Sequence, residues 1–182
     1  MVYEGYDREK FRIQNSEFRI NQTINKYNLK YQNYFLFVGT VQPRKNLERL
    51  IKAFAKLSSD NKLVIAGSRG WSAEGIYKLP RKLGVEDKVK FLGYVPEGDL
   101  PALYSGALAL TFPSLFEGFG LPILEAQACG CPVLTSNLSS MPEVAGKGAV
   151  YVNPYDVDDI VRGMKRIQNL EFRVQNVKAG LE

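Results

Sequence analysis

Histidine is the most informative absence from this chain of 182 residues, which contains none. Without histidine, the sequence lacks the most common general base and the most common metal ligand, and a Ser-His-Asp arrangement is excluded. Any reaction that this chain supports must therefore use carboxylates, cations and backbone dipoles.

Cysteine is scarce as well, and the two cysteines, Cys129 and Cys131, are separated by a single glycine. This spacing differs from the Cys-x-x-Cys of redox and zinc sites, so both are expected to be small buried hydrophobic residues. A chain with free thiols and no signal peptide is typical of a reducing compartment, which predicts a cytoplasmic location. Its apolar runs are far shorter than the roughly 18 residues of a membrane span. Peripheral association with the inner face of the plasma membrane stays open.

The excess of positive charge is modest. Twenty-four Lys and Arg against 19 Asp and Glu give a net charge of +5, which suits anionic ligands such as nucleotides and phosphates. Because the basic residues are dispersed and no block of five like charges occurs, nucleic acid is not expected as a partner.

Six short apolar runs, each followed by turn residues, alternate with helical patterns from residue 34 onward. The runs lie at 34–38, 62–66, 89–92, 107–112, 132–135 and 149–152, and they are typical of buried strands in a parallel sheet. Helical periodicity occurs at 47–57, 100–104, 122–128 and 160–167. This alternation predicts an α/β fold with a doubly wound, Rossmann-like open parallel sheet of about six strands, which binds ligands at the carboxyl ends of its strands.

The first 33 residues differ from the rest, because they are polar, rich in Asn and Gln, and carry no strand pattern. Ile20, Ile24 and Tyr27 have a helical spacing. We therefore predict an interdomain linker with a lead-in helix over residues 1–33 and one Rossmann-like domain over residues 34–182.

The strongest candidate site is the segment 111–130, T-F-P-S-L-F-E-G-F-G-L-P-I-L-E-A-Q-A-C-G, whose pattern is that of strand, loop and helix. Gly118 and Gly120 allow a close approach of backbone to ligand, and Pro122 suits a first helical turn. Backbone N–H groups at that helix start would form an anion site suited to a diphosphate. Glu125 could accept two ribose hydroxyls, and Glu117 could hold sugar hydroxyls or face developing positive charge.

A second candidate lies in the segment 37–50, F-V-G-T-V-Q-P-R-K-N-L-E-R-L. Gly39 ends the first predicted strand, and Arg44 and Lys45 directly precede a predicted helix for which Asn46 is the expected N-cap. Two cations at this place could clamp a diphosphate and offset the negative charge that grows as a sugar leaves.

These strings resemble the C-terminal, nucleotide-sugar-binding domain of glycosyltransferase family 4, whose enzymes have two facing Rossmann-like domains (the GT-B fold). Every fixed position of the family signature E-G-F-G-L-P-x-x-E is present from Glu117 to Glu125. The resemblance covers about residues 34–170. The chain departs from the family at Thr40, where many members have arginine, and at Asn46, where glycine is usual.

The resemblance implies that Lys45 binds the donor phosphates, and we assign the role of the missing arginine to Arg44. The catalytic residues are then expected to be Glu117, Lys45 and Arg44. The donor-binding residues implied are Gly39, Thr40, Arg44, Lys45, Gly67, Val95, Glu117, Gly118, Phe119, Gly120, Leu121 and Glu125.

The family's activity is retaining transfer of a hexose from an NDP-sugar to a glycan or lipid-linked acceptor, with no metal or other cofactor. The 37–47 string is similar to bacterial mannosyltransferases of surface polysaccharide assembly, which favours GDP-mannose over a UDP-sugar. Residues 2–7 resemble the family's interdomain segment, with Glu4 in place of the usual Asn. We therefore expect a donor half without the N-terminal acceptor domain, able to bind the donor but not to transfer the sugar alone.

Two alternatives and one competing motif remain. The first alternative is a non-catalytic nucleotide-sugar-binding regulatory module, but Glu117, Glu125 and Lys45 are all intact, which argues against loss of catalysis. An NAD-type dehydrogenase is disfavoured, because no G-x-G-x-x-G precedes the first helix. Asp156 and Asp158 form an Asp-x-Asp, the metal-binding signature of the other major glycosyltransferase fold, but their place before a predicted helix favours capping.

Overall fold

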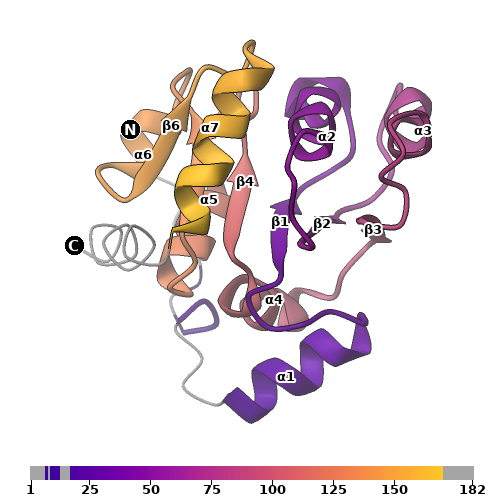
Figure 1. The fold of residues 1–182 in the computed structure, drawn as a ribbon. Coiled ribbons are helices and arrows are strands. Elements are labelled where there is room, and N and C mark those ends of the chain that lie inside the picture. Colours follow the sequence, from indigo (N-terminus) through magenta and orange to yellow (C-terminus); the bar gives the residue numbers. More distant parts are fainter. Residues whose placement is uncertain (1–6, 8, 13–16, 170–182) are drawn as a thin grey trace.

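The computed structural model describes residue 7, residues 9–12 and residues 17–169 of the chain (Figure 1). The expected interdomain segment at residues 2–7 lies outside the described residues apart from Asp7. The strands are β1 (Tyr34–Val38), β2 (Lys62–Ala66), β3 (Val89–Gly93), β4 (Ala109–Phe112), β5 (Val133–Ser136) and β6 (Ala149–Val152). The α-helices are α1 (Glu17–Lys26), α2 (Leu47–Ala55), α3 (Glu74–Lys82), α4 (Leu100–Gly106), α5 (Leu121–Ala128), α6 (Met141–Ala145) and α7 (Val157–Gln168).

The strands form one six-stranded sheet in the order β3-β2-β1-β4-β5-β6, and every pairing is parallel. Helix α2 contacts both α3 and α7 in one layer, and α1, α4, α5 and α6 are linked by contacts in the other. The predicted doubly wound fold is therefore confirmed. Its topological switch point, where the strand order reverses, lies between β1 and β4, which is where such sheets bind their ligands.

Burial of the central strands explains why they could be predicted from continuous hydrophobic runs in the sequence. Phe35, Leu36 and Phe37 of β1 are fully buried, and the rings of Phe37 and Phe112 stack with their centroids 5.7 Å apart across β1 and β4. A strand covered on both faces must be apolar at every position, so it appears in the sequence as an unbroken hydrophobic run.

The helices agree less closely with the sequence patterns. Helix α1 is present, and its Ile20 and Ile24 are buried in the layer that contains α4, beside which α1 lies in Figure 1. Helix α3 had no predicted counterpart, because Gly75 and Pro80 lie inside it and few of its residues are buried. Glycine and proline usually argue against a helix interior, and here the contact of α3 with α2 outweighs them.

Both cysteines are free and buried, as predicted. Burial disfavours the thiolate, and it raises the pKa of Cys129 to about 12 and that of Cys131 still further. The Asp156 side chain accepts hydrogen bonds from the backbone N–H groups of Asp158 (2.8 Å) and Asp159 (3.2 Å), so the Asp-x-Asp motif caps α7. None of the helices within the described part of the chain has the length and apolar character that crossing a membrane requires.

Candidate active site

The predicted site residues gather where β1 and β4 end, at the switch point of the sheet. Two segments carry half of them. The cation segment (residues 43–46) follows β1 and contains a short 3-10 turn, η1 (Pro43–Lys45). The glycine loop (residues 117–120) follows β4 and leads into α5.

Glycines bring the loops after β1 and β2 into contact. A Cβ atom on Gly67 would lie 1.9 Å from the carbonyl oxygen of Gly39, and both glycines have positive φ angles of 157° and 143°. The added Cβ of Gly70 would lie 2.7 Å from the Thr40 methyl carbon. Thr40 therefore packs against the loop after β2 at the position where many family members have arginine, and only glycine fits at Gly67.

Asn46 corrects one prediction. It occupies the N-cap position of α2, but its φ of 60° is left-handed and its side chain makes no capping hydrogen bond. Instead its Nδ2 donates to the carbonyls of Pro113 (2.9 Å) and Pro154 (2.7 Å), and its Oδ1 accepts from Arg49 (3.1 Å). Left-handed backbone favours glycine and next asparagine, which explains why asparagine can replace the family's glycine here.

The three predicted catalytic residues form one ion-pair cluster, in which Lys45 and Glu117 are buried and Arg44 is partly exposed. Glu117 is 7% exposed, and its two carboxylate oxygens accept from Lys45 Nζ at 2.7 Å and from Arg44 at 2.9 Å. Arg44 also donates to the carbonyl of Phe116, and Lys45 Nζ lies 5.0 Å from the centroid of the Phe112 ring. Charge-assisted bonds of this kind fix geometry firmly. The cluster carries two positive charges and one negative charge.

The glycine loop ends at Gly120, whose φ of 103° and place at the N-cap of α5 require glycine. Within the described residues, the backbone N–H groups of Gly118, Gly120 and Leu121 have no hydrogen-bond partner. Unpaired N–H groups at a helix start form a positive pole that attracts anions. The predicted anion site therefore lies directly beside the cation cluster.

Two residues that the sequence analysis missed hold the glycine loop. The Ser139 hydroxyl donates to the Glu117 carbonyl (2.8 Å), and the Ser140 hydroxyl lies within bonding distance of the carbonyls of Glu117 (3.1 Å) and Phe119 (2.9 Å). Both serines lie between β5 and α6, so no local sequence signal connected them to residues 117–120.

Glu125 is half-buried on the side of α5 that meets α4. One of its carboxylate oxygens accepts from the Tyr104 hydroxyl at 2.8 Å. Burial raises the pKa of Glu125 above its ordinary value, and the nearby negative charge of Glu97 acts in the same direction. Glu97 begins the short turn η2 (Glu97–Asp99) just after the buried Val95, so Glu125 and the Val95 segment lie in one neighbourhood.

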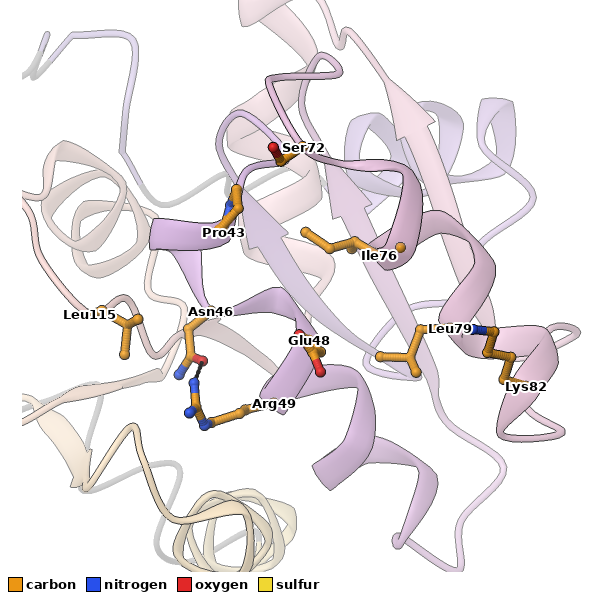
Figure 2. Close-up of a pocket in the computed structure, with 10 residues that line it drawn as sticks. Pro43, Asn46, Glu48, Arg49, Ser72, Ile76, Leu79, Lys82 and Leu115 are labelled. Atoms are coloured by element: carbon orange, nitrogen blue, oxygen red, sulfur yellow. Dashed lines mark hydrogen bonds between the residues drawn. The ribbon is translucent and has the colours of Figure 1, made fainter.

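A cavity of about 410 Å³ borders the cation segment (Figure 2). Pro43, Asn46 and Leu115 line it from the site side, and residues of α2 and α3 complete it together with Ser72, which precedes α3. Figure 2 shows Ile76 and Leu79 of α3 facing this space, with the Asn46–Arg49 hydrogen bond at its edge. Glu117 and the glycine loop are not among its lining residues, so the cavity is distinct from the ion-pair cluster.

Among the described residues, no group of three or more His, Cys, Asp or Glu side chains is placed to hold a metal ion. The charged side chains of the ion-pair cluster are those of Arg44, Lys45 and Glu117.

The family described as "Glycosyl transferases group 1" matches residues 20–180. This chain belongs to that glycosyltransferase family. O-antigen chain mannosyltransferase B of Escherichia coli is 43% identical over 141 residues, which are 75% of this chain and 37% of that protein. O-antigen chain mannosyltransferase RfbU of Salmonella typhimurium is 40% identical over 139 residues, 76% of this chain and 39% of that protein. The chain thus spans well under half the length of these relatives.

Solved structures match the fold of this glycosyltransferase domain. Sucrose-phosphate synthase from Thermosynechococcus elongatus has a TM-score of 0.85 and 26% identity, covering 97% of this chain and 45% of that one. Anabaena HepE, crystallised with UDP and glucose, has a TM-score of 0.88 and 20% identity, and the match covers 99% of this chain and 50% of HepE. The C-terminal domain of a Francisella tularensis group 1 glycosyl transferase has a TM-score of 0.81 and 21% identity, covering 97% and 95%. The chain therefore has the fold of one Rossmann-like half of a GT-B glycosyltransferase.

Proposed function

We propose that this chain is the donor-binding domain of a retaining mannosyltransferase that uses GDP-mannose in surface polysaccharide assembly. The observation that carries the proposal is the cluster of Arg44, Lys45 and Glu117 beside the unpaired N–H groups of the glycine loop. A diphosphate placed there would meet two cations and a helix start at the switch point of the sheet.

In this proposal Lys45 and Arg44 bind the donor phosphates and neutralise the charge that develops as the sugar leaves. No metal ion is then needed for that task. Glu117 faces the sugar and stabilises positive charge on its ring, while the new bond forms on the face that the phosphate leaves. Because two cations already orient the Glu117 carboxylate, little reorganisation would accompany the reaction.

Glu125 is proposed to accept the ribose hydroxyls. The Tyr104 hydroxyl occupies one of its oxygens and fixes its direction, and the nearby Val95 segment would border the base. The raised pKa of Glu125 fits this role, because a half-buried carboxylate gains most from new hydrogen-bond donors that compensate for lost water.

Mannose is proposed because two relatives are named O-antigen mannosyltransferases, and GDP because the 37–47 string resembles bacterial mannosyltransferases. The acceptor is proposed to be a glycan or a lipid-linked glycan held by another domain, and the site of action the cytoplasm, at the inner face of the membrane. The HepE complex contains UDP and glucose, so a UDP-sugar is the donor that must be tested against GDP-mannose.

A thermal-shift panel tests the donor assignment. The chain would be heated with GDP-mannose, UDP-glucose, UDP-N-acetylglucosamine, GDP and UDP, each with EDTA and with magnesium. At about 100 times Kd, a ligand stabilises the fold by about 2.7 kcal/mol, which corresponds to a rise of about 5–10 °C for a domain of this size. We expect that rise with GDP-mannose and GDP, with no dependence on magnesium.

A larger shift with a UDP-sugar would contradict the donor assignment but leave the transferase proposal in place. The matched variant is Lys45→Ala, which should weaken binding of the nucleoside diphosphate by about 1.5–3 kcal/mol and leave the nucleoside unaffected. No shift with any of these ligands would overturn the proposed function.

A further inference from the structure

We propose that Ser139 and Ser140 are positioning residues that aim the backbone N–H groups of the glycine loop at the donor phosphates. The inference rests on the proposed function, since it assigns a device to the same site. Its basis is the set of hydrogen bonds that join the β5–α6 connection to the loop after β4.

The argument begins with the geometry of the peptide bond. In a trans peptide, the C=O of one residue and the N–H of the next point in opposite directions, and the described residues contain no cis peptide. The Glu117 and Phe119 carbonyls are turned toward the serine hydroxyls. The N–H groups of Gly118 and Gly120 must therefore point away from the serines, both on the side opposite to them.

Ser140 does not use its hydroxyl as its position would suggest. It is the N-cap residue of α6, where serine is among the best capping side chains, yet its side chain makes no capping bond. Its single hydroxyl proton is shared between the carbonyls of Glu117 and Phe119. The Ser140 side chain therefore does not stabilise the start of α6 and instead contacts the glycine loop.

Ser139 shows a second departure from ordinary local structure. Its φ is 55°, a left-handed conformation that is uncommon for serine. In this conformation its hydroxyl donates to the Glu117 carbonyl at 2.8 Å and lies 3.4 Å from the Glu117 N–H. The two serines thus hold the 117–118 and 119–120 peptide planes through the Glu117 and Phe119 carbonyls, and Ser139 also contacts the 116–117 plane through the Glu117 N–H.

Free rotation of those planes would scatter the loop N–H groups, and glycine permits such rotation because it has no Cβ. A loop with two glycines needs an external contact to keep one orientation. The serines supply that contact, and in doing so they make the anion-binding geometry present before the ligand arrives.

The test compares Ser140→Ala with Ser140→Thr and with a matched control, Ser105→Ala. Ser105 also donates to a carbonyl, that of Cys129 at 3.2 Å, but at the far end of α5. Calorimetry would measure binding of GDP or UDP, whichever binds the wild type more tightly, and of the corresponding nucleoside. Thermal unfolding of each variant reports on the fold.

We expect Ser140→Ala to weaken binding of the diphosphate about tenfold, which is the effect of about one hydrogen bond to a charged group. The nucleoside should bind as before, Ser140→Thr should restore the affinity, and Ser105→Ala should change neither constant. Ser139→Ala should act in the same direction as Ser140→Ala.

Equal losses for the diphosphate and the nucleoside would overturn the positioning role and show general loosening of the fold. If Ser140→Ala left the affinity for the diphosphate unchanged while Lys45→Ala lowered it, the positioning role would be overturned and the proposed function would stand. If the wild type bound neither diphosphate, the proposed function itself would fall, and the positioning role with it.

Discussion

Glu117 and Glu125 are eight positions apart and belong to one signature, yet their surroundings are opposite. Glu117 is buried between two cations at 2.7 and 2.9 Å. Glu125 has a neutral hydroxyl as its partner, and burial and the charge of Glu97 raise its pKa. The contrast indicates that the Glu117 carboxylate is held in place by two cations. The Glu125 carboxylate, in contrast, has too few hydrogen-bond donors around it and would gain from the hydroxyls of a ligand.

The largest expected effect comes from removing the shorter cation contact of Glu117. Lys45→Ala leaves the buried carboxylate with Arg44 alone, and breaking a buried pair typically costs about 3–5 kcal/mol. Because Arg44 remains, we expect a loss of about 3 kcal/mol in urea unfolding. The control Lys52→Ala breaks the exposed pair with Glu48 and should cost only about 0.3–0.5 kcal/mol. Similar losses for the two variants would remove the basis for calling Glu117 a buried, cation-dependent charge.

The next effect separates the two carboxylates by ligand. Glu125→Gln should weaken binding of the nucleoside diphosphate and of the NDP-sugar alike, by about 1.5–3 kcal/mol, because both contain the ribose. Glu117→Gln should weaken only the NDP-sugar, and its release of Arg44 and Lys45 should not reduce affinity for the diphosphate. Calorimetry with matched ligand pairs decides. If Glu117→Gln lowered diphosphate binding as much as Glu125→Gln does, the two roles would be wrongly assigned.

Tyr104→Phe tests the neutral partner of Glu125. The hydroxyl that donates to Glu125 is lost from a fully buried residue, at a cost of about 1–2 kcal/mol. Since this hydrogen bond lowers the pKa of Glu125, its loss should raise that pKa further in an NMR titration. Tyr34→Phe is the matched control, because its buried hydroxyl donates to the Leu103 carbonyl instead. It should cost similar stability and leave the Glu125 titration unchanged; a shift there as well would exclude a specific Tyr104 effect.

The smallest effect concerns pH and stability. A carboxyl whose pKa is raised on folding favours the fold fully below its unfolded pKa, and that contribution is lost as pH rises through the folded pKa. Glu125→Gln should therefore unfold like the wild type near pH 4 and be slightly more stable at pH 7. Unfolding in urea at the two pH values measures this. A variant less stable at pH 7 by the same margin as at pH 4 would show that burial of the charge carries no cost.

The sequence predicted the parts of the molecule whose signal is local. Strand β1 could be predicted because burial makes its residues apolar, and the loop and helix start at residues 117–125 because the glycines and Pro122 that shape them are close together in the sequence. Tyr104, Ser139 and Ser140 were not readable. Each acts through a contact with a residue far away in the chain, and a tyrosine or serine alone has the composition of any helix or turn.

Asn46 illustrates the same limit from another direction. Its place before α2 suggested an ordinary N-cap, a local role that the sequence pattern supports. The left-handed backbone turns the side chain away from the helix start and toward two carbonyls, 67 and 108 positions further along the chain. Only the assembled sheet brings Pro113 and Pro154 within its reach.

The bonds of Asn46 also have a mechanical consequence. Through its two donated hydrogen bonds, the Asn46 side chain links the loops that follow β1, β4 and β6. Loops so joined cannot open independently, because displacement of any one would break a buried hydrogen bond. The loops at this edge of the sheet, which include Lys45 and Glu117, would then move together as one rigid body. Closure around a substrate would then require a hinge outside these loops, about which they would all move together.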